Sequence, residues 1–150
     1  MTDTPARPVL QLRLVVEAQD YDQALAFYRD ALGLPQLEAY TGDGDARVAI
    51  LDAGRATLEI ANPAQKRLID DVEVGKQVAP RLRVAFEVTD AAGVTADLVD
   101  AGASLVAPPV RTPWDSLNAR LDAPAGLQIT VFQELGGAAT PSPADGSREG

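Results

Sequence analysis

Apolar and polar side chains alternate along residues 10–17, so one face of an extended chain would be rich in leucine. This period of two predicts a half-buried strand. From residue 21 to residue 32 the apolar positions recur at helical spacing, with Asp20 as the N-cap and Gly33 as the stop. Alternation then returns and predicts three more strands. Their ranges are 36–40, 47–51 and 56–61.

The same order of elements occurs twice. Residues 12–20 (LRLVVEAQD) and 82–90 (LRVAFEVTD) share Leu, Arg, Glu and Asp at an offset of 70, and the LDA of residues 51–53 recurs at 121–123. The repeat predicts two βαβββ units and an α+β fold with helices on one face of a sheet. The second unit should contain a strand at 82–88, a helix from Asp90 to about residue 101, and strands near 104–107, 117–122 and 127–133.

The repeat also sets the expected boundaries. The first unit spans residues 10–62 and the second spans 81–135, with 63–80 as the linker. A short helix should begin in the linker at Asn62-Pro63, where a cap is followed by a first-turn proline. We expect a flexible N-terminus over 1–9 and a disordered, Gly/Pro/Ser-rich tail over 136–150.

Composition excludes several classes of protein. The 150 residues are 46% hydrophobic, which is enough for a core, and they include no cysteine and no histidine. Thiolate and imidazole metal ligands and nucleophile–histidine mechanisms are therefore excluded. The net charge of −9 argues against nucleic-acid binding. No apolar run is long enough to cross a membrane, and the first residues do not look like a signal peptide, so we expect a cytoplasmic protein.

Several short motifs carry a family resemblance. They are Phe27-Tyr28, Leu32-Gly33-Leu34, Ala85-Phe86-Glu87-Val88, Thr112-Pro113-Trp114, Pro124-x-Gly126 and Ile129-x-Val131-Phe132. With them the chain resembles the vicinal oxygen chelate superfamily, which includes glyoxalase I, bleomycin resistance proteins and extradiol dioxygenases. The resemblance implies two βαβββ modules whose curled sheets surround a cavity, usually within a homodimer.

Enzymes of that family hold a divalent metal with four side chains. The resemblance places these positions on Arg13, Glu59, Arg83 and Thr130. A guanidinium has no lone pair to donate, and one carboxylate with one hydroxyl is a poor ligand set for a divalent ion. We therefore expect no metal and no cofactor at these positions.

Strand parity gives the expected lining of the cavity. The face opposite the leucines carries five charged residues, which are Arg13, Glu17, Glu59, Arg83 and Glu87. Gln128, Thr130 and Phe132 share one face of the last strand, and Trp114 lies in a loop. The five charges could form a closed ion-pair network that holds the modules together, or they could bind a ligand. Trp114 could cover the cavity, plug its end or contact a second copy.

The sequence favours a metal-free small-molecule-binding protein of the glyoxalase/bleomycin resistance type. Sequestering a cationic or aromatic drug, and so conferring antibiotic resistance, would be such a role. One alternative is a lyase or isomerase that uses Glu59 or Glu87 as a general base. A metal-dependent glyoxalase or dioxygenase is less consistent with the residues. An assembly protein whose cavity is filled by its own ion pairs is the remaining alternative.

Overall fold

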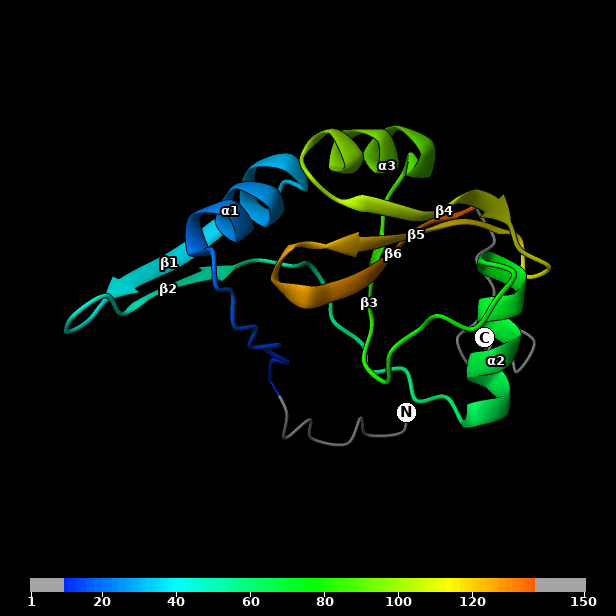
Figure 1. Ribbon diagram of the computed structural model, residues 1–150, viewed down its shortest axis with the longest axis horizontal. Coiled ribbons are helices and arrows are strands. Elements are labelled where there is room, and N and C mark those ends of the chain that lie inside the picture. The colour runs from blue at the N-terminus through cyan, green and yellow to red at the C-terminus, as the bar shows by residue number, and fades with distance from the viewer. Residues whose placement is uncertain (1–9, 137–150) are drawn as a thin grey trace, which may run out of the picture.

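The second repeat forms a four-stranded sheet in the order β3-β6-β5-β4. The computed structural model, shown in Figure 1, describes residues 10–136, so the predictions for 1–9 and for most of the tail lie outside the described residues. β3 (Val84–Glu87) runs parallel to β6 (Leu127–Glu134). β5 (Ser116–Ala123) is antiparallel to β6 and to β4 (Ser104–Arg111). A 3-10 turn, Pro124–Gly126, joins β5 to β6.

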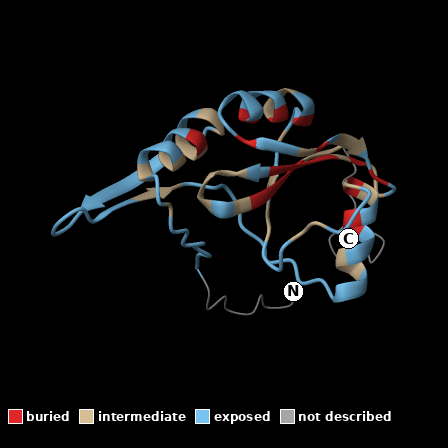
Figure 2. Ribbon diagram, in the orientation of Figure 1, coloured by how far each residue is buried: buried red, intermediate tan, exposed pale blue. Residues whose placement is uncertain are grey.

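The apolar face of this sheet is covered by helices. α3 (Ala91–Asp100) is capped by Asp90, whose side chain accepts a hydrogen bond of 3.0 Å from the Gly93 amide. Its fully buried residue Leu98 belongs to one core with Leu121, Ile129 and Val131 of the sheet. The buried strand residues are seen below α3 in Figure 2. Full burial of each large apolar side chain contributes about 1.5–3 kcal/mol.

The first helix also packs on this core, through Phe27. α1 (Tyr21–Leu25) continues as a π-helix over Ala26–Ala31. The interval from Asp20 to Gly33 is one residue longer than that from Asp90 to Gly102, and the wider π turn accommodates the extra residue. The hydroxyl of Tyr28 donates a 2.8 Å hydrogen bond to the Pro124 carbonyl, and burial raises the pKa of Tyr28 to about 12.

The first repeat builds a separate sheet with only two strands. β1 (Gln36–Thr41) and β2 (Arg47–Leu51) pair as a hairpin that extends away from the rest of the molecule (Figure 1). The strands expected at 10–17 and 56–61 do not form, and Leu10 and Ile60 are 94% and 86% exposed. That expectation is wrong for the single chain, because a strand needs a neighbouring edge and neither segment pairs with one. The two sheets are consequently not closed around a cavity.

α2 (Pro63–Glu73) begins where the sequence predicts a helix. The Asn62 side chain caps it by accepting a 2.9 Å hydrogen bond from the Gln65 amide. α2 contacts β4 and β5 and lies on the side of the sheet away from α3 (Figure 1). The α+β class predicted from the repeat is thus confirmed. No helix among residues 10–136 has the length and apolar character needed to cross a membrane.

Candidate functional site

Polar side chains are buried on the sheet face that α3 does not cover. Along β5 the polar residues Ser116, Asn118 and Arg120 alternate with residues of the apolar core, and all three are buried. Gln128 and Thr130 on β6 are also buried and are the cross-strand partners of Asp122 and Arg120. This face therefore consists of hydrogen-bonding groups rather than core side chains.

Arg120 is the centre of this polar face, with a side chain that is 0% exposed. Its Nη1 donates to Asp70 Oδ1 at 2.9 Å and to Gln128 Oε1 at 2.9 Å, and its Nη2 donates to Glu73 Oε1 at 2.7 Å. Asp70 and Glu73 lie one turn apart on α2, so both carboxylates reach the same guanidinium. These charged groups need one another because an unpaired buried charge is costly.

Asp70 has further donors that fix it in place. Its Oδ2 accepts hydrogen bonds of 2.9 Å from the amides of Val78 and Ala79, and Lys66 Nζ lies 3.8 Å from it. Burial acts to raise the pKa of Asp70, but the hydrogen bonds from Ala79, Arg120 and Val78 outweigh burial and hold this pKa below its usual value. Asp70 is therefore a charged anchor for both α2 and the segment that follows it.

A relay of hydrogen bonds runs from α2 to the β4–β5 turn. Asn118 Nδ2 donates to Glu73 Oε2 at 2.7 Å, Ser116 Oγ donates to Asn118 Oδ1 at 2.7 Å, and the hydroxyls of Ser116 and Thr112 are 2.8 Å apart. The turn carries Trp114, which is partly buried. Contacts in α2 and the position of this turn are thus linked.

The structure brings together Arg83 and Thr130, two of the four positions that the resemblance assigns to the metal. Arg83 precedes β3, and its Nη1 donates to the Thr130 hydroxyl across the β3–β6 pair. Burial lowers the pKa of Arg83, and the nearby positive charge of Arg120 lowers it further. The carboxylates of Glu73, Glu59 and Asp70 oppose this effect. The guanidinium is therefore partly buried beside a neutral hydroxyl.

Other predicted site residues are not brought together in the single chain. Arg13, Glu17, Glu59 and Glu87 are all exposed. Within residues 10–136 the structure has no ion pair joining any two of these four and Arg83. Gln128 is buried against Arg120, and Phe132 is partly buried.

The buried ion-pair network is instead made by residues that sequence reasoning missed, namely Arg120, Asp70 and Glu73. A signal for Arg120 was present, because Ser116, Asn118 and Arg120 alternate with apolar residues along the predicted strand. Asp70 and Glu73 gave no comparable signal, since acidic residues on a linker helix are usually exposed to solvent.

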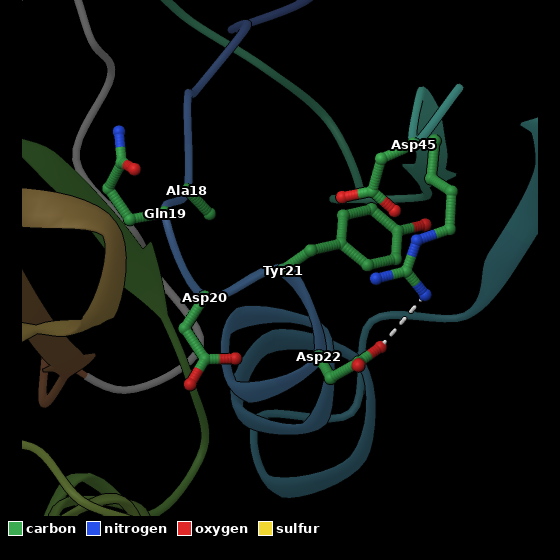
Figure 3. A pocket seen from close by; sticks show the side chains of 7 residues that line it. Ala18, Gln19, Asp20, Tyr21, Asp22 and Asp45 are labelled. Carbon is green, nitrogen blue, oxygen red and sulfur yellow. Dashed lines mark hydrogen bonds and ion pairs between the residues drawn. The ribbon is translucent and has the colours of Figure 1, made fainter. Parts of the chain in front are cut away.

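A hollow lies elsewhere, at the start of α1. It encloses about 550 Å³ between Asp20, Tyr21, Asp22, Asp45 and Arg47. Figure 3 shows the acidic side chains Asp20, Asp22 and Asp45 on different sides of the Tyr21 ring. Arg47 pairs with Asp22 at 3.1 Å and lies over the ring of Tyr21 at 4.3 Å. Its one basic side chain is thus already engaged, and the hollow is separate from the Arg83 face.

Comparison with known proteins identifies the family. The model of the Glyoxalase/Bleomycin resistance protein/Dioxygenase superfamily matches residues 11–131. The chain belongs to this superfamily. A comparison with curated proteins found no match.

Solved structures of the superfamily fold are similar to the chain. A glyoxalase-related enzyme from Fulvimarina pelagi is 19% identical, with a TM-score of 0.52 over 84% of this chain and 89% of its own. TnmS3, an antibiotic binding protein from Streptomyces sp. CB03234, is 19% identical, with a TM-score of 0.51 over 86% of this chain and 99% of its own. TioX from Micromonospora sp. ML1 is 18% identical, with a TM-score of 0.50 over 77% and 91%. At these identities the likeness establishes the fold alone.

The superfamily's metal positions do not fit a metal in this chain. Arg13 and Arg83 are cationic donors, and Arg83 already donates to Thr130, the fourth position. Across residues 10–136, no three acidic side chains converge as metal ligands would. The side chains at these four positions are therefore not a usual set of ligands for a divalent ion.

Proposed function

We propose that this superfamily member binds a small organic molecule at the face around Arg83 and Thr130, without using a metal. The observation that carries the proposal is that Arg83 is partly buried and its hydrogen-bond partner is a neutral hydroxyl. A guanidinium has five N–H donors in a planar fork, so most of them are not used by Thr130. Such a group supports binding of an oxyanion.

The lack of an ion pair at Arg83 among residues 10–136 is our reason for proposing an anionic ligand rather than a cationic one. The carboxylates of Asp70 and Glu73 are already engaged by Arg120, whereas Arg83 makes no ion pair within the described part of the chain. An aromatic carboxylate or phenolate would give Arg83 a charge-assisted, bidentate partner. A cationic drug would instead have to use Glu59 or Glu17. TnmS3 is described as an antibiotic binding protein, which is consistent with a binding role for this chain. Drug sequestration would be one specific form of such a role.

A homodimer is the assembly that we propose. Leu10, Val15, Leu58 and Ile60 are 94%, 84%, 73% and 86% exposed in the single chain. In the second repeat the corresponding segments are β3 and β6, which pair in one sheet. A second copy of the chain is the occupant that would give residues 10–17 and 56–61 strand neighbours and bury their leucines. A two-stranded hairpin such as β1–β2 also gains stability from added strands.

The enzymatic alternative has less support. A general base acting beside Arg83 would need a carboxylate removed from water, and both candidates, Glu59 and Glu87, are exposed in the single chain. The cytoplasmic location expected from the sequence stays a prediction.

A thermal-shift comparison of benzoate with benzamidine tests the proposed function. The two probes share a ring but carry opposite charges. We expect benzoate to raise the Tm of the wild type, R83M to remove this rise, and R81M, which changes the exposed Arg81, to retain it. Stabilisation by benzamidine alone, abolished in E59Q, would overturn the anionic assignment. A rise in Tm with Ni²⁺ or Zn²⁺ that is lost in E59Q would overturn the metal-free assignment.

A further inference from the structure

We propose that α2 is a displaceable cover of the binding face, and that a ligand with two carboxylates replaces Asp70 and Glu73 on Arg120 while it also reaches Arg83. This inference rests on the proposed function and names the ligand class. It starts from the two ion pairs of Arg120, whose Nη1 lies 2.9 Å from Asp70 Oδ1 and whose Nη2 lies 2.7 Å from Glu73 Oε1. Two carboxylates of a ligand could bind the guanidinium in the same way.

The two arginines flank β6, because β3 and β5 are its two neighbours in the sheet. Thr130 links them, because it accepts a hydrogen bond from Arg83 and is the cross-strand partner of Arg120. The charge of Arg120 also lowers the pKa of Arg83, as a like charge does. Two guanidiniums repel each other because both are positively charged, and a ligand with two negative charges would offset that repulsion.

Arg120 is incompletely satisfied by α2. Its Nε is buried without a hydrogen-bond partner, although both terminal nitrogens are bonded. A buried N–H without an acceptor carries a desolvation penalty. A carboxylate that binds the Nε–Nη2 edge of the guanidinium would remove this penalty, whereas Glu73 binds Nη2 alone.

α2 is attached mainly through polar contacts. Its only buried apolar residue is Ile69, and its other buried residues are Asp70 and Glu73. The preceding segment, residues 52–62, is exposed throughout and contains no strand or helix. On the other side Gly75 has φ +89°, a conformation that favours glycine at a helix end. Exchange of one pair of carboxylates for another therefore breaks few apolar contacts.

Displacement of α2 would also be transmitted to the Trp114 turn. Glu73 Oε2 accepts from Asn118, and the hydrogen bonds continue through Ser116 to Thr112. When Glu73 moves away with α2, the Asn118 side-chain amide loses its acceptor and can donate to a ligand oxygen instead. The same event thus offers a third donor beside the two arginines.

The test compares isophthalate, which has two carboxylates, with benzoate, which has one, in wild type, E73Q and D71N. Asp71 is exposed on the same helix, so D71N is a control for the change in charge. The apparent affinity is reduced by the fraction of molecules in which the site is covered. We expect E73Q, which weakens the cover, to tighten isophthalate binding by about tenfold, D71N to leave it unchanged, and benzoate to respond less.

Hydrogen exchange of the α2 amides is the second readout. Saturating isophthalate should speed exchange over residues 66–74 in the wild type, and benzoate should not. Equal isophthalate affinity in wild type and E73Q, with unchanged α2 exchange, would overturn the displaceable cover while small-molecule binding at Arg83 remains. If neither probe binds any of the three proteins, the proposed function itself fails, and this inference fails with it.

Discussion

Arg120 shows how one residue can organise a polar interior. Its side chain is 0% exposed. Its guanidinium binds the carboxylates of Glu73 and Asp70, which lie 47 and 50 positions earlier in the sequence on α2. Replacement by methionine would leave Asp70 and Glu73 buried without their main cation. We expect R120M to lower the free energy of unfolding by about 3–5 kcal/mol, measured by urea denaturation.

The matched control for that change is R111M. Arg111 pairs with Asp115 at the surface, with a side chain that is 70% exposed, and should contribute only about 0–1 kcal/mol. Equal losses in the two variants would contradict the view that burial makes the Arg120 pair important.

Asp70 gives the molecule a defined response to acid. Its pKa is held below the ordinary value of 3.8, so the unfolded chain binds the proton more readily than the folded chain does. The contribution of Asp70 to stability is therefore present above pH 3.8 and is lost as the pH falls through the lower, folded value. We expect the free energy of unfolding to fall more steeply with acid below about pH 4 in wild type than in D70N. Identical slopes in urea titrations between pH 6 and pH 3 would count against this role.

At the scale of elements, capping and periodicity made much of the fold predictable. Asp20, Asn62 and Asp90 all accept the capping hydrogen bonds that their positions suggest. The strand at 47–51 was predicted with its observed limits, and the second sheet was predicted to within a few residues. The β4 strand runs further than expected, to Arg111, because the bulges in its pairing with β5 allow Pro108-Pro109 inside a strand at the edge of the sheet.

The helix α2 depends on its cap more than a core helix would. Its start is fixed by Asn62, and few apolar contacts hold its first turn. We expect N62A to cost about 1 kcal/mol of stability, measured by urea unfolding, and to increase hydrogen exchange at residues 64–67. N62D, which preserves the acceptor, should behave as the wild type does. A loss in N62D equal to that in N62A would show that the cap is not the cause.

The candidate site was less predictable than the fold. The resemblance grouped Arg83 with Thr130, and the structure joins the two by a hydrogen bond next to the β3–β6 pair. Strand parity could not reveal that Arg120 takes its partners from α2, since no periodic pattern relates a linker helix to a strand about 50 positions later. From parity alone, an ion-pair network was one of two possibilities for Arg13, Glu17, Glu59, Arg83 and Glu87, and ligand binding was the other.

At the scale of the whole molecule, the two repeats differ in how complete they are. The second repeat builds four strands and the first builds two, although both sequences alternate apolar and polar residues in their predicted strands. The difference leaves Leu58 and Ile60 at 73% and 86% exposure. These side chains carry the proposal of a homodimer.

We expect the double variant L58S/I60S to be monomeric where the wild type is a dimer, as measured by sedimentation velocity. Each large apolar side chain buried in the assembly contributes about 1.5–3 kcal/mol, so the loss should shift the equilibrium by several powers of ten. V99S removes an apolar side chain on α3 that is 39% exposed and should leave the dimer intact. A monomeric wild type at micromolar concentration would contradict the proposed assembly.

The most direct test of the account is calorimetric titration of benzoate into wild type, R83M and R81M, with EDTA present throughout. If Arg83 binds the ligand in place of a metal, the wild type and R81M should bind equally in chelator. R83M should bind at least about tenfold more weakly, since a hydrogen bond to a charged group contributes about 1.5–3 kcal/mol. Binding that disappears with EDTA and returns with Zn²⁺ or Ni²⁺, and that R83M leaves unchanged, would contradict the central claim.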